Sequence, residues 1–312
     1  MLKDFKDLRI VFMGTPDFAV ASLDALVQAG GNIVGVVTAP DKPAGRGMQL
    51  QQSAVKKYAV AHNLLVLQPE KLKNEAFIES LKNLNADVQA VVAFRMLPEV
   101  VWNMPPMGTI NVHGSLLPQY RGAAPINWAV INGEAFTGVT TFKLQHEIDT
   151  GDILLSEKIS IKENDTAGNI HDQLMHIGAQ LLVKTLQGLA SNSIVEVPQS
   201  SIEGPLQHAP KIFTSTCQID WNKTNDEVYN LIRGLAPYPT AFTHLNGKTL
   251  KINEAIKVDE KPTIAIGDYK TDEKNYLYFA TATGYISVTQ LQLEGKKRMD
   301  VKEFLRGYRF NK

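Results

Sequence analysis

Residues 8–14 read LRIVFMG, a run of apolar residues that ends at a glycine. Related runs follow in the first half of the chain: NIVGVVT at 32–38, DVQAVVAF at 87–94 and TINVH at 109–113. Stretches with helical periodicity separate them. Strands that stay apolar along their length, rather than alternating with polar residues, are typical of a parallel sheet that helices cover on both faces. The sequence therefore predicts an α/β domain around a mostly parallel sheet.

The pattern changes further along the chain. GVTTFKL (138–144) and DILLSEKISI (152–161) alternate apolar and polar residues, which predicts antiparallel strands at the edge of the sheet. After a long amphipathic helix that ends near residue 189, residues 190–208 are rich in Ser, Pro, Gln and Asn and predict a linker. Residues 209–312 contain several strand-like runs and an Asn-Gly turn at 246–247, so we expect a smaller, barrel-like β domain there.

Composition narrows the class of protein. The chain has 312 residues, more than one compact core usually holds, and its hydrophobic content of 44% is that of an ordinary globular protein. It contains no run of roughly 20 apolar residues and no signal-like N-terminus, which predicts a cytoplasmic protein without a membrane span. A single cysteine, Cys217, excludes an intrachain disulfide and a cysteine-based zinc site.

The charge of the chain is balanced as a whole but divided between its two parts. The formal net charge is +0, which argues against a purely electrostatic nucleic-acid binder. Residues 1–208 carry 16 Lys and Arg against 20 Asp and Glu, whereas residues 209–312 carry 16 against 12. The positive excess of the C-terminal part indicates an anionic partner, although chance scatter over two solvated surfaces explains the split equally well.

Two polar side chains interrupt the strand at 109–113. Asn111 and His113 are two residues apart, so they project from one face of a strand, and at its carboxyl end they point into the crevice where α/β sheets bind ligands. Asp149, in HEIDTGD (146–152) after the next strand, could reach His113. An imidazole held by a carboxylate beside a carboxamide donor predicts proton transfer next to an oxyanion-stabilising group. The alternative is a histidine whose hydrogen bonds are purely structural.

Two other chemistries fit these residues less well. His113, His146, Asp149 and Asp152 could ligate a divalent ion, but their spacing matches no metal-binding motif, so no metal is expected. Ser115 lacks the G-x-S-x-G elbow of a serine nucleophile, and a turn hydroxyl is the better interpretation of it.

The segment TAPDKPAGRGMQLQQS (38–53) is long for a connection between a strand and a helix. It holds Lys42 and Arg46 among prolines and glycines. Contact with a phosphate-bearing substrate is one interpretation of this segment, and a solvated surface loop is the other.

Several motifs together carry a resemblance to a known family. INVHGSLLP (110–118), RGAAPINWAVINGE (121–134) and DTGD (149–152) resemble the formyltransferases that use 10-formyltetrahydrofolate. GTPDFAV (14–20), PDKPAGRG (40–47) and the C-terminal β domain resemble the branch of that family that formylates methionyl-tRNA. The resemblance, which covers essentially the whole chain, implies formyl transfer from 10-formyltetrahydrofolate to the free amine of initiator methionyl-tRNA for translation initiation. We further expect a monomer that uses no metal and binds neither DNA nor membrane.

The resemblance also implies how the chain is divided. Residues 1–189 would form a Rossmann-type catalytic domain that binds the folate, residues 190–208 a linker, and residues 209–312 an OB-like β-barrel that helps to bind tRNA. Match to the family motifs assigns the site residues as follows: Asn111, His113 and Asp149 for catalysis; Ser115, Leu116, Leu117 and Pro118 for the folate site; Lys42 and Arg46 for the tRNA acceptor arm.

Two positions depart from the family pattern. AFRMLP (93–98) has Phe94 and Arg95 where many members have a Tyr-Gly pair, and Lys42 replaces an arginine, which keeps the charge but loses bidentate geometry. Three other functions remain as alternatives: formylation of a small amine such as glycinamide ribonucleotide or an amino sugar, hydrolysis of formylfolate, and RNA binding without catalysis.

Overall fold

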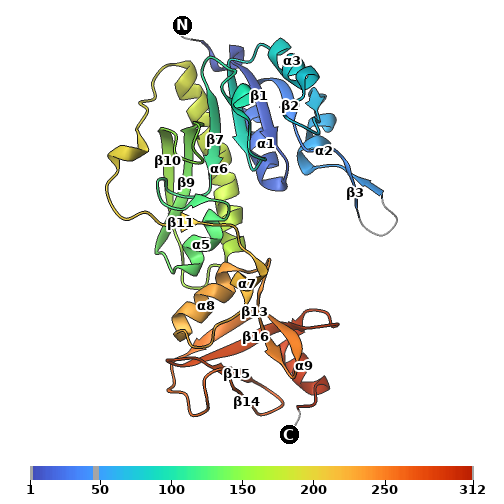
Figure 1. Ribbon diagram of the computed structural model, residues 1–312, viewed down its shortest axis with the longest axis vertical. Coiled ribbons are helices and arrows are strands. Elements are labelled where there is room, and N and C mark those ends of the chain that lie inside the picture. Colours follow the sequence, from blue (N-terminus) through green and yellow to red (C-terminus); the bar gives the residue numbers. More distant parts are fainter. Residues whose placement is uncertain (1–2, 45–48, 311–312) are drawn as a thin grey trace. The chain divides into compact units, whose positions relative to one another are not determined.

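The structure is a computed structural model that describes residues 3–44 and 49–310 (Figure 1). Contacts between backbone segments divide the chain into two compact units, and their parts alternate along the sequence. The first unit comprises Met1–Arg121, Gly138–Lys158 and Asp172–Gln207, and the second comprises Gly122–Thr137, Ile159–His171 and His208–Lys312. The predicted division into a catalytic domain (1–189), a linker (190–208) and a β-barrel domain (209–312) stays a prediction.

The large sheet is of the Rossmann type. Its strands are β1 (Arg9–Gly14), β2 (Asn32–Val37), β5 (Val66–Leu67), β6 (Val88–Val92), β7 (Thr109–His113), β9 (Phe136–Lys143) and β10 (Ile153–Ser160). They lie in the order β10-β9-β7-β6-β1-β2-β5. The pairs β1–β2, β1–β6, β2–β5 and β6–β7 are parallel, whereas β9 runs antiparallel to β7. Counted in chain order, the parallel strands have the 3-2-1-4-5 arrangement of a doubly wound sheet.

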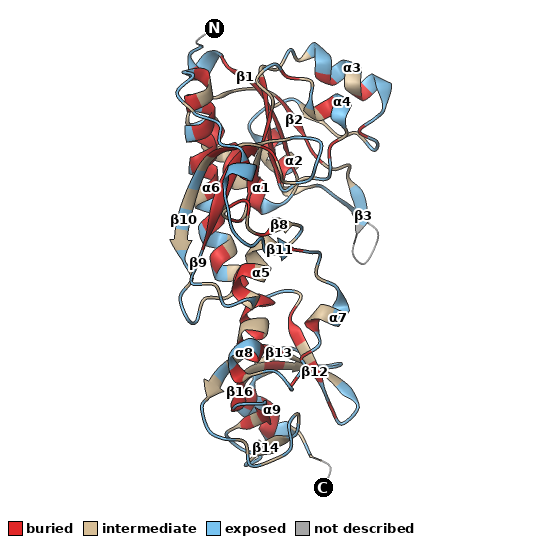
Figure 2. Ribbon diagram, turned by 60° about the vertical axis from the view of Figure 1, so that its left-hand side comes forward, coloured by how far each residue is buried: buried red, intermediate tan, exposed pale blue. Residues whose placement is uncertain are grey.

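Helices cover this sheet because its strands are apolar on both faces. They are α1 (Asp17–Gln28), α2 (Ala54–Ala61), α3 (Glu75–Asn83), α4 (Glu99–Trp102) and α6 (Ala167–Ala190). Val11 and Met13 pack in one cluster with Phe77 of α3 and Val101 of α4. Phe12 is equally buried and, by the two-residue period of a strand, faces the other side of the sheet. Figure 2 shows the buried strands among these helices, and together with the parallel pairings this confirms the predicted covered, mostly parallel sheet.

Local sequence signals set the ends of several of these elements. Ser53 accepts a hydrogen bond from the Lys56 backbone N–H at the start of α2, and Asn74 does the same for Phe77 at the start of α3. Short pieces complete the first unit and its connections: η1 (Phe5–Asp7), η2 (Gln199–Ser201), and the paired strands β3 (Lys42–Ala44) and β4 (Gln49–Gln51). Strand β8 (Arg121–Gly122) pairs with β11 (His208–Ala209).

The second sheet is antiparallel. Its strands are β12 (Ala241–Leu245), β13 (Lys248–Val258), β14 (Tyr269–Thr271), β15 (Leu277–Ala280), β16 (Tyr285–Leu293) and β17 (Met299–Asp300). They lie in the order β12-β13-β16-β15-β14, with β17 paired to β16. The helices of this unit are α5 (Pro125–Ile131), α7 (Thr214–Cys217), α8 (Asn225–Gly234) and α9 (Val301–Gly307). The sheet is curled into a half-barrel with β12 and β14 at the two ends of its strand order, so the predicted barrel-like β domain is confirmed as a half-barrel.

The core of the second sheet is apolar and aromatic. Trp221 stacks on Phe279 with ring centroids 4.8 Å apart, and α8 and α9 contribute Ile232 and Phe304 to the same cluster. The turn between β12 and β13 is formed by Asn246 and Gly247 at φ 48 and 75, both in the left-handed region, as the predicted hairpin requires. Across the described residues, no helix is long and apolar enough to cross a membrane.

Candidate active site

The candidate site lies at the end of β7, where the two polar residues Asn111 and His113 belong to the strand. His113 is the last residue of the strand and only 6% exposed, and Asn111 lies two positions before it. On the neighbouring strand β9, Asn111 is opposite Phe142 and His113 is opposite Thr140. The Phe142 ring meets the imidazole edge to face, with centroids 6.3 Å apart. Packing against the Phe142 ring of β9 therefore restricts how the imidazole can turn.

The two nitrogens of His113 have different partners. Nε2 lies 2.9 Å from the Tyr120 backbone carbonyl, which can only accept, so Nε2 carries a proton and donates. Nδ1 lies 3.9 Å from Oδ2 of Asp149. Since Nε2 is held in the N–H form, Nδ1 is the nitrogen at which this histidine can gain or lose a proton. The structure thus brings His113 and Asp149 together, as the sequence predicted.

Asp149 reaches His113 by a route that the strand pattern does not reveal. Because β9 runs antiparallel to β7, its last residue, Lys143, lies opposite Ile110 at the far end of the site strand. The connection 144–152 therefore has to fold back along β7 before β10 begins. Asp149 has φ 56, a left-handed conformation that aspartate tolerates better than most side chains, and its carboxylate is 12% exposed.

The Asn111 side chain is the polar group of the site that remains open. It is intermediate in exposure, and within residues 3–44 and 49–310 no hydrogen bond from its carboxamide is found. A carboxamide N–H beside a histidine is suited to bind an oxygen on which negative charge develops.

Residues 115–118 form a tight turn directly after the strand. The Ser115 hydroxyl donates to the Gln119 carbonyl at 2.6 Å. Thr140 holds the turn from β9: its hydroxyl donates to the Ser115 carbonyl at 2.7 Å and accepts from the Leu117 N–H at 3.1 Å. Ser115, Leu117 and Pro118 are buried, and Leu116 is partly exposed. The role of Ser115 as a turn hydroxyl agrees with its predicted part, while the folate contacts of this segment stay a prediction.

The segment after β6 shows how the chain accommodates its departure from the family pattern. Arg95 donates to the Glu70 carbonyl at 2.8 Å and also to the Pro69 carbonyl. Its guanidinium lies over the Phe94 ring at 5.7 Å, and that ring packs against the apolar cluster of α3 and α4. Arg95 is therefore fixed to the backbone at residues 69–70, and Phe94 packs on the side of the sheet that α3 and α4 cover.

The β3–β4 hairpin holds one of the two predicted tRNA contacts. Lys42 is exposed at the start of β3, and Arg46 lies outside the described residues. The hairpin is anchored at its base by Asp41, which accepts from Lys56 Nζ at 2.5 Å and from Gln68 Nε2 at 2.8 Å. These two hydrogen bonds, the one from Lys56 first, hold the pKa of the Asp41 carboxyl below its ordinary value of 3.8.

The four residues considered as metal ligands are not gathered into one cluster. His146 has a side chain that is 88% exposed and lies 4.0 Å from Glu99, on the side of α4. In the part of the chain that the structure describes, no group of three or more His, Cys, Asp or Glu side chains has the arrangement of a metal site.

Comparison with protein families gives two matches along the chain. The family model described as "Formyl transferase" matches residues 8–186, and the model described as "Formyl transferase, C-terminal domain" matches residues 211–309. The chain is 53% identical over 310 residues to a methionyl-tRNA formyltransferase of Bacteroides fragilis, covering 97% of this chain and 96% of that protein. It is 57% identical over 313 residues to the methionyl-tRNA formyltransferase of Phocaeicola vulgatus, covering 97% of each.

Solved structures share the fold at much lower identity. WlaRD, a sugar 3N-formyl transferase solved in the presence of dTDP and 5-N-formyl-THF, has a TM-score of 0.68 at 21% identity, covering 93% of this chain and 99% of that one. The N-formyltransferase from Helicobacter canadensis, solved with folinic acid and dTDP-3-aminofucose, has a TM-score of 0.66 at 21% identity, covering 90% and 98%. These likenesses show the architecture of the two sheets and leave the acceptor of the reaction open.

Proposed function

This chain belongs to the formyl transferase family, and from that premise we propose that it transfers the formyl group of 10-formyltetrahydrofolate to the free amino group of initiator methionyl-tRNA. The observation that carries the proposal is the open Asn111 carboxamide on the same strand as His113, whose Nδ1 faces Asp149 at 3.9 Å. The choice of acceptor rests on the near-complete alignment with methionyl-tRNA formyltransferases.

The three site residues have separate parts in the reaction. When the amine of the aminoacyl group attacks the formyl carbon, negative charge develops on the formyl oxygen, and Asn111 donates a hydrogen bond to it. His113 uses Nδ1 to carry the proton that the amine loses toward the departing nitrogen of the folate. Asp149 fixes the imidazole so that Nδ1 is presented in one direction.

The two substrates are assigned to different parts of the chain. The buried turn at 115–118 forms a wall of the folate site, since its shape is fixed by Thr140 and does not depend on a ligand. The β3–β4 hairpin with Lys42 and Arg46 contacts the acceptor arm of the tRNA, and residues 209–312 add further phosphate contacts. The protein acts as a monomer in the cytoplasm, where aminoacyl-tRNA is found.

The decisive experiment compares acceptors with the full chain. Purified protein is given 10-formyltetrahydrofolate together with methionyl-tRNA, with glycinamide ribonucleotide, or with a dTDP-linked amino sugar. Rapid formylation of methionyl-tRNA alone is the expected result. Faster transfer to either small amine would overturn the assignment of the acceptor. Release of formate and tetrahydrofolate in the absence of any amine, by transfer of the formyl group to water, would identify a hydrolase.

A further inference from the structure

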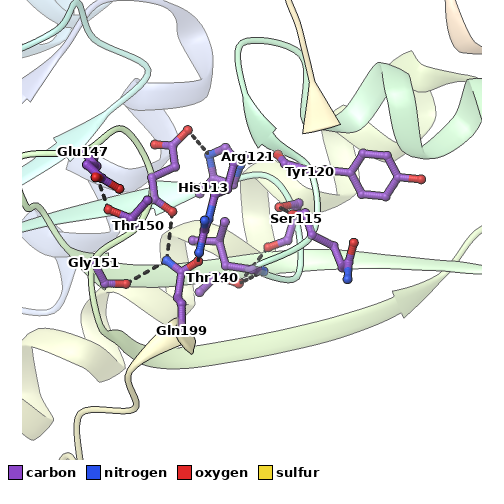
Figure 3. A network of polar contacts seen from close by, with 12 residues as sticks. His113, Ser115, Tyr120, Arg121, Thr140, Glu147, Thr150, Gly151 and Gln199 are labelled. Carbon is purple, nitrogen blue, oxygen red and sulfur yellow. Dashed lines mark hydrogen bonds and ion pairs between the residues drawn. The ribbon is translucent and has the colours of Figure 1, made fainter. Parts of the chain in front are cut away.

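Gln199, which is not among the predicted site residues, lies against the loop at 144–152 that contains Asp149 (Figure 3). Gln199, in the segment that the sequence presents as a linker, is only 3% exposed. Two backbone hydrogen bonds between Val197 and Ile153, of 2.8 and 2.9 Å, fasten this segment to the start of β10. The segment therefore has a fixed position beside the loop that contains Asp149.

The carboxamide of Gln199 has partners on both of its ends. Nε2 donates to the carbonyls of Asp149 at 2.9 Å and of Gly151 at 2.7 Å. Oε1 accepts from Nε and Nη2 of Arg121 at 2.9 and 2.7 Å. Backbone carbonyls can only accept and a guanidinium can only donate, so the orientation of the amide is unique. A single orientation of the Gln199 carboxamide therefore makes all four hydrogen bonds.

The two carbonyls that Gln199 holds lie on either side of Thr150. At one of them, Asp149 has the left-handed backbone conformation of φ 56. At the other, a Cβ added to Gly151 would lie 1.6 Å from the Lys143 carbonyl oxygen, so the backbone there already packs as closely as glycine permits. The Thr150 hydroxyl donates to the Glu147 carbonyl at 3.0 Å and closes the same turn. The direction of the Asp149 carboxylate thus depends on two peptide planes that Gln199 fixes.

We propose that Gln199 is a positioning residue for the formyl transfer reaction: it holds the Asp149 loop in the conformation that directs the carboxylate to His113. Arg121 in turn holds Gln199 so that both of its N–H groups face the loop. The inference rests on the proposed function, because it acts through the catalytic part assigned to Asp149. Because Gln199 is only 3% exposed, we expect it to act through the loop and not by contact with a substrate.

The first test separates the two ends of the amide. Gln199→Glu keeps the oxygen that faces Arg121 but cannot donate to the loop carbonyls, and Gln199→Ala removes both contacts. We expect kcat to fall about 30-fold in both variants, since a misplacement of about 1 Å costs up to 100-fold. The KM values for folate and for methionyl-tRNA should stay within about two-fold of wild type. Gln187→Ala, on an exposed position of α6, is the matched control and should leave both parameters unchanged.

The second test asks whether Gln199 acts through Asp149. If it does, Gln199→Glu should cost little more activity when Asp149→Asn is already present, because the residue it positions has lost its charge. A merely structural role would lower activity by the same factor in both backgrounds. Full kcat in Gln199→Glu, or additive losses in the double variant, would overturn the proposal.

A third measurement needs no activity. Amide hydrogen exchange of residues 147–152 should accelerate in Gln199→Glu and Gln199→Ala, with exchange of β6 and β7 unchanged. Unchanged exchange in the loop would refute the positioning role of Gln199 even if activity fell. If instead the wild-type chain failed to formylate methionyl-tRNA, while exchange in the loop still accelerated in both variants, the proposed function would be wrong. The conclusion that Gln199 holds the loop would then still be supported.

Discussion

The loop at 144–152, which we call the catalytic loop, and the β3–β4 hairpin both connect elements of the first unit, but they are held by different kinds of contact. The catalytic loop is held by the buried side chain of Gln199, which is 3% exposed and donates hydrogen bonds to two of the loop's carbonyls. The described part of the hairpin is held at its base by Asp41, which accepts hydrogen bonds from Lys56 and Gln68; the side chains of Lys56 and Asp41 are 17% and 22% exposed. The difference matches the two proposed tasks, because proton transfer requires a fixed geometry, whereas contact with a long polyanion works through charge over a wider range of positions.

The largest expected effect comes from removing the charge that the catalytic loop presents. Asp149→Asn should lower kcat by about 1,000-fold, within the range for a group that controls proton transfer, and should leave folate binding nearly unchanged. Asparagine also tolerates the left-handed backbone at this position, so the loop conformation is retained. Steady-state kinetics with methionyl-tRNA, together with folate titration, provide the measurement. Activity within a few-fold of wild type would show that Asp149 has no such part.

Asn111→Ala should have the next largest effect. Loss of one donor to a developing oxyanion costs roughly 100-fold in kcat in other enzymes, and here the carboxamide has no other hydrogen bond within the described residues. Asn103→Ala, at an exposed position after α4, is the control for a general effect of removing an asparagine. A rise in the folate KM with normal kcat would place Asn111 in ground-state binding instead.

Most of the fold follows from local patterns in the sequence. The apolar runs that became β1 and β6 are buried on both faces, which is why their periodicity predicted a covered parallel sheet. Asn246 and Gly247 adopt the turn that their residue types favour. The barrel-like β domain was also predicted from its strand-like runs, although its strand pairings join residues far apart in sequence, such as Leu250 with Leu293, and no local signal fixes these pairings.

The sequence predicted which residues form the site, but not the path of the loop that contains Asp149 or the residue that holds this loop. The spacing of Asn111 and His113 is a property of one strand, so it could be read directly. The path of 144–152 depends on β9 running antiparallel to β7, and the contact of Gln199 with Asp149 spans about 50 positions in sequence. A polar residue after Pro198 in a stretch without periodicity carries no signal of burial. The catalytic and binding roles of these residues stay predictions until variants are measured.

The hairpin should respond to charge removal in binding and not in the chemical step. Lys42→Ala and Arg46→Ala are each expected to raise the KM for methionyl-tRNA about five-fold and to reduce its dependence on salt, because each removes one phosphate contact. The folate KM and kcat should change little. Lys57→Ala, an exposed lysine of α2, is the matched control. Equal changes in the KM of both substrates would remove the hairpin from the tRNA-binding surface.

The smallest expected effect tests the anchor of the hairpin. The hydrogen bonds from Lys56 and Gln68 lower the pKa of Asp41 from 3.8, so the contribution of its carboxylate is complete at neutral pH and is lost as the pH falls through the lowered pKa. Asp41→Asn should therefore raise the KM for methionyl-tRNA only about two-fold at pH 7, in line with the small contribution of ion pairs that, like Lys56–Asp41, stay partly exposed to solvent. Amide exchange at Lys42 and Gln51, the pair at the open end of the hairpin, should accelerate in the variant. Acidification below about pH 4 should loosen the wild-type hairpin and have less effect on the variant, after correction for the intrinsic pH dependence of exchange. If Asp41→Asn instead lowered kcat as strongly as a change in the catalytic loop, the hairpin would be part of the catalytic geometry and the contrast between the two regions would be wrong.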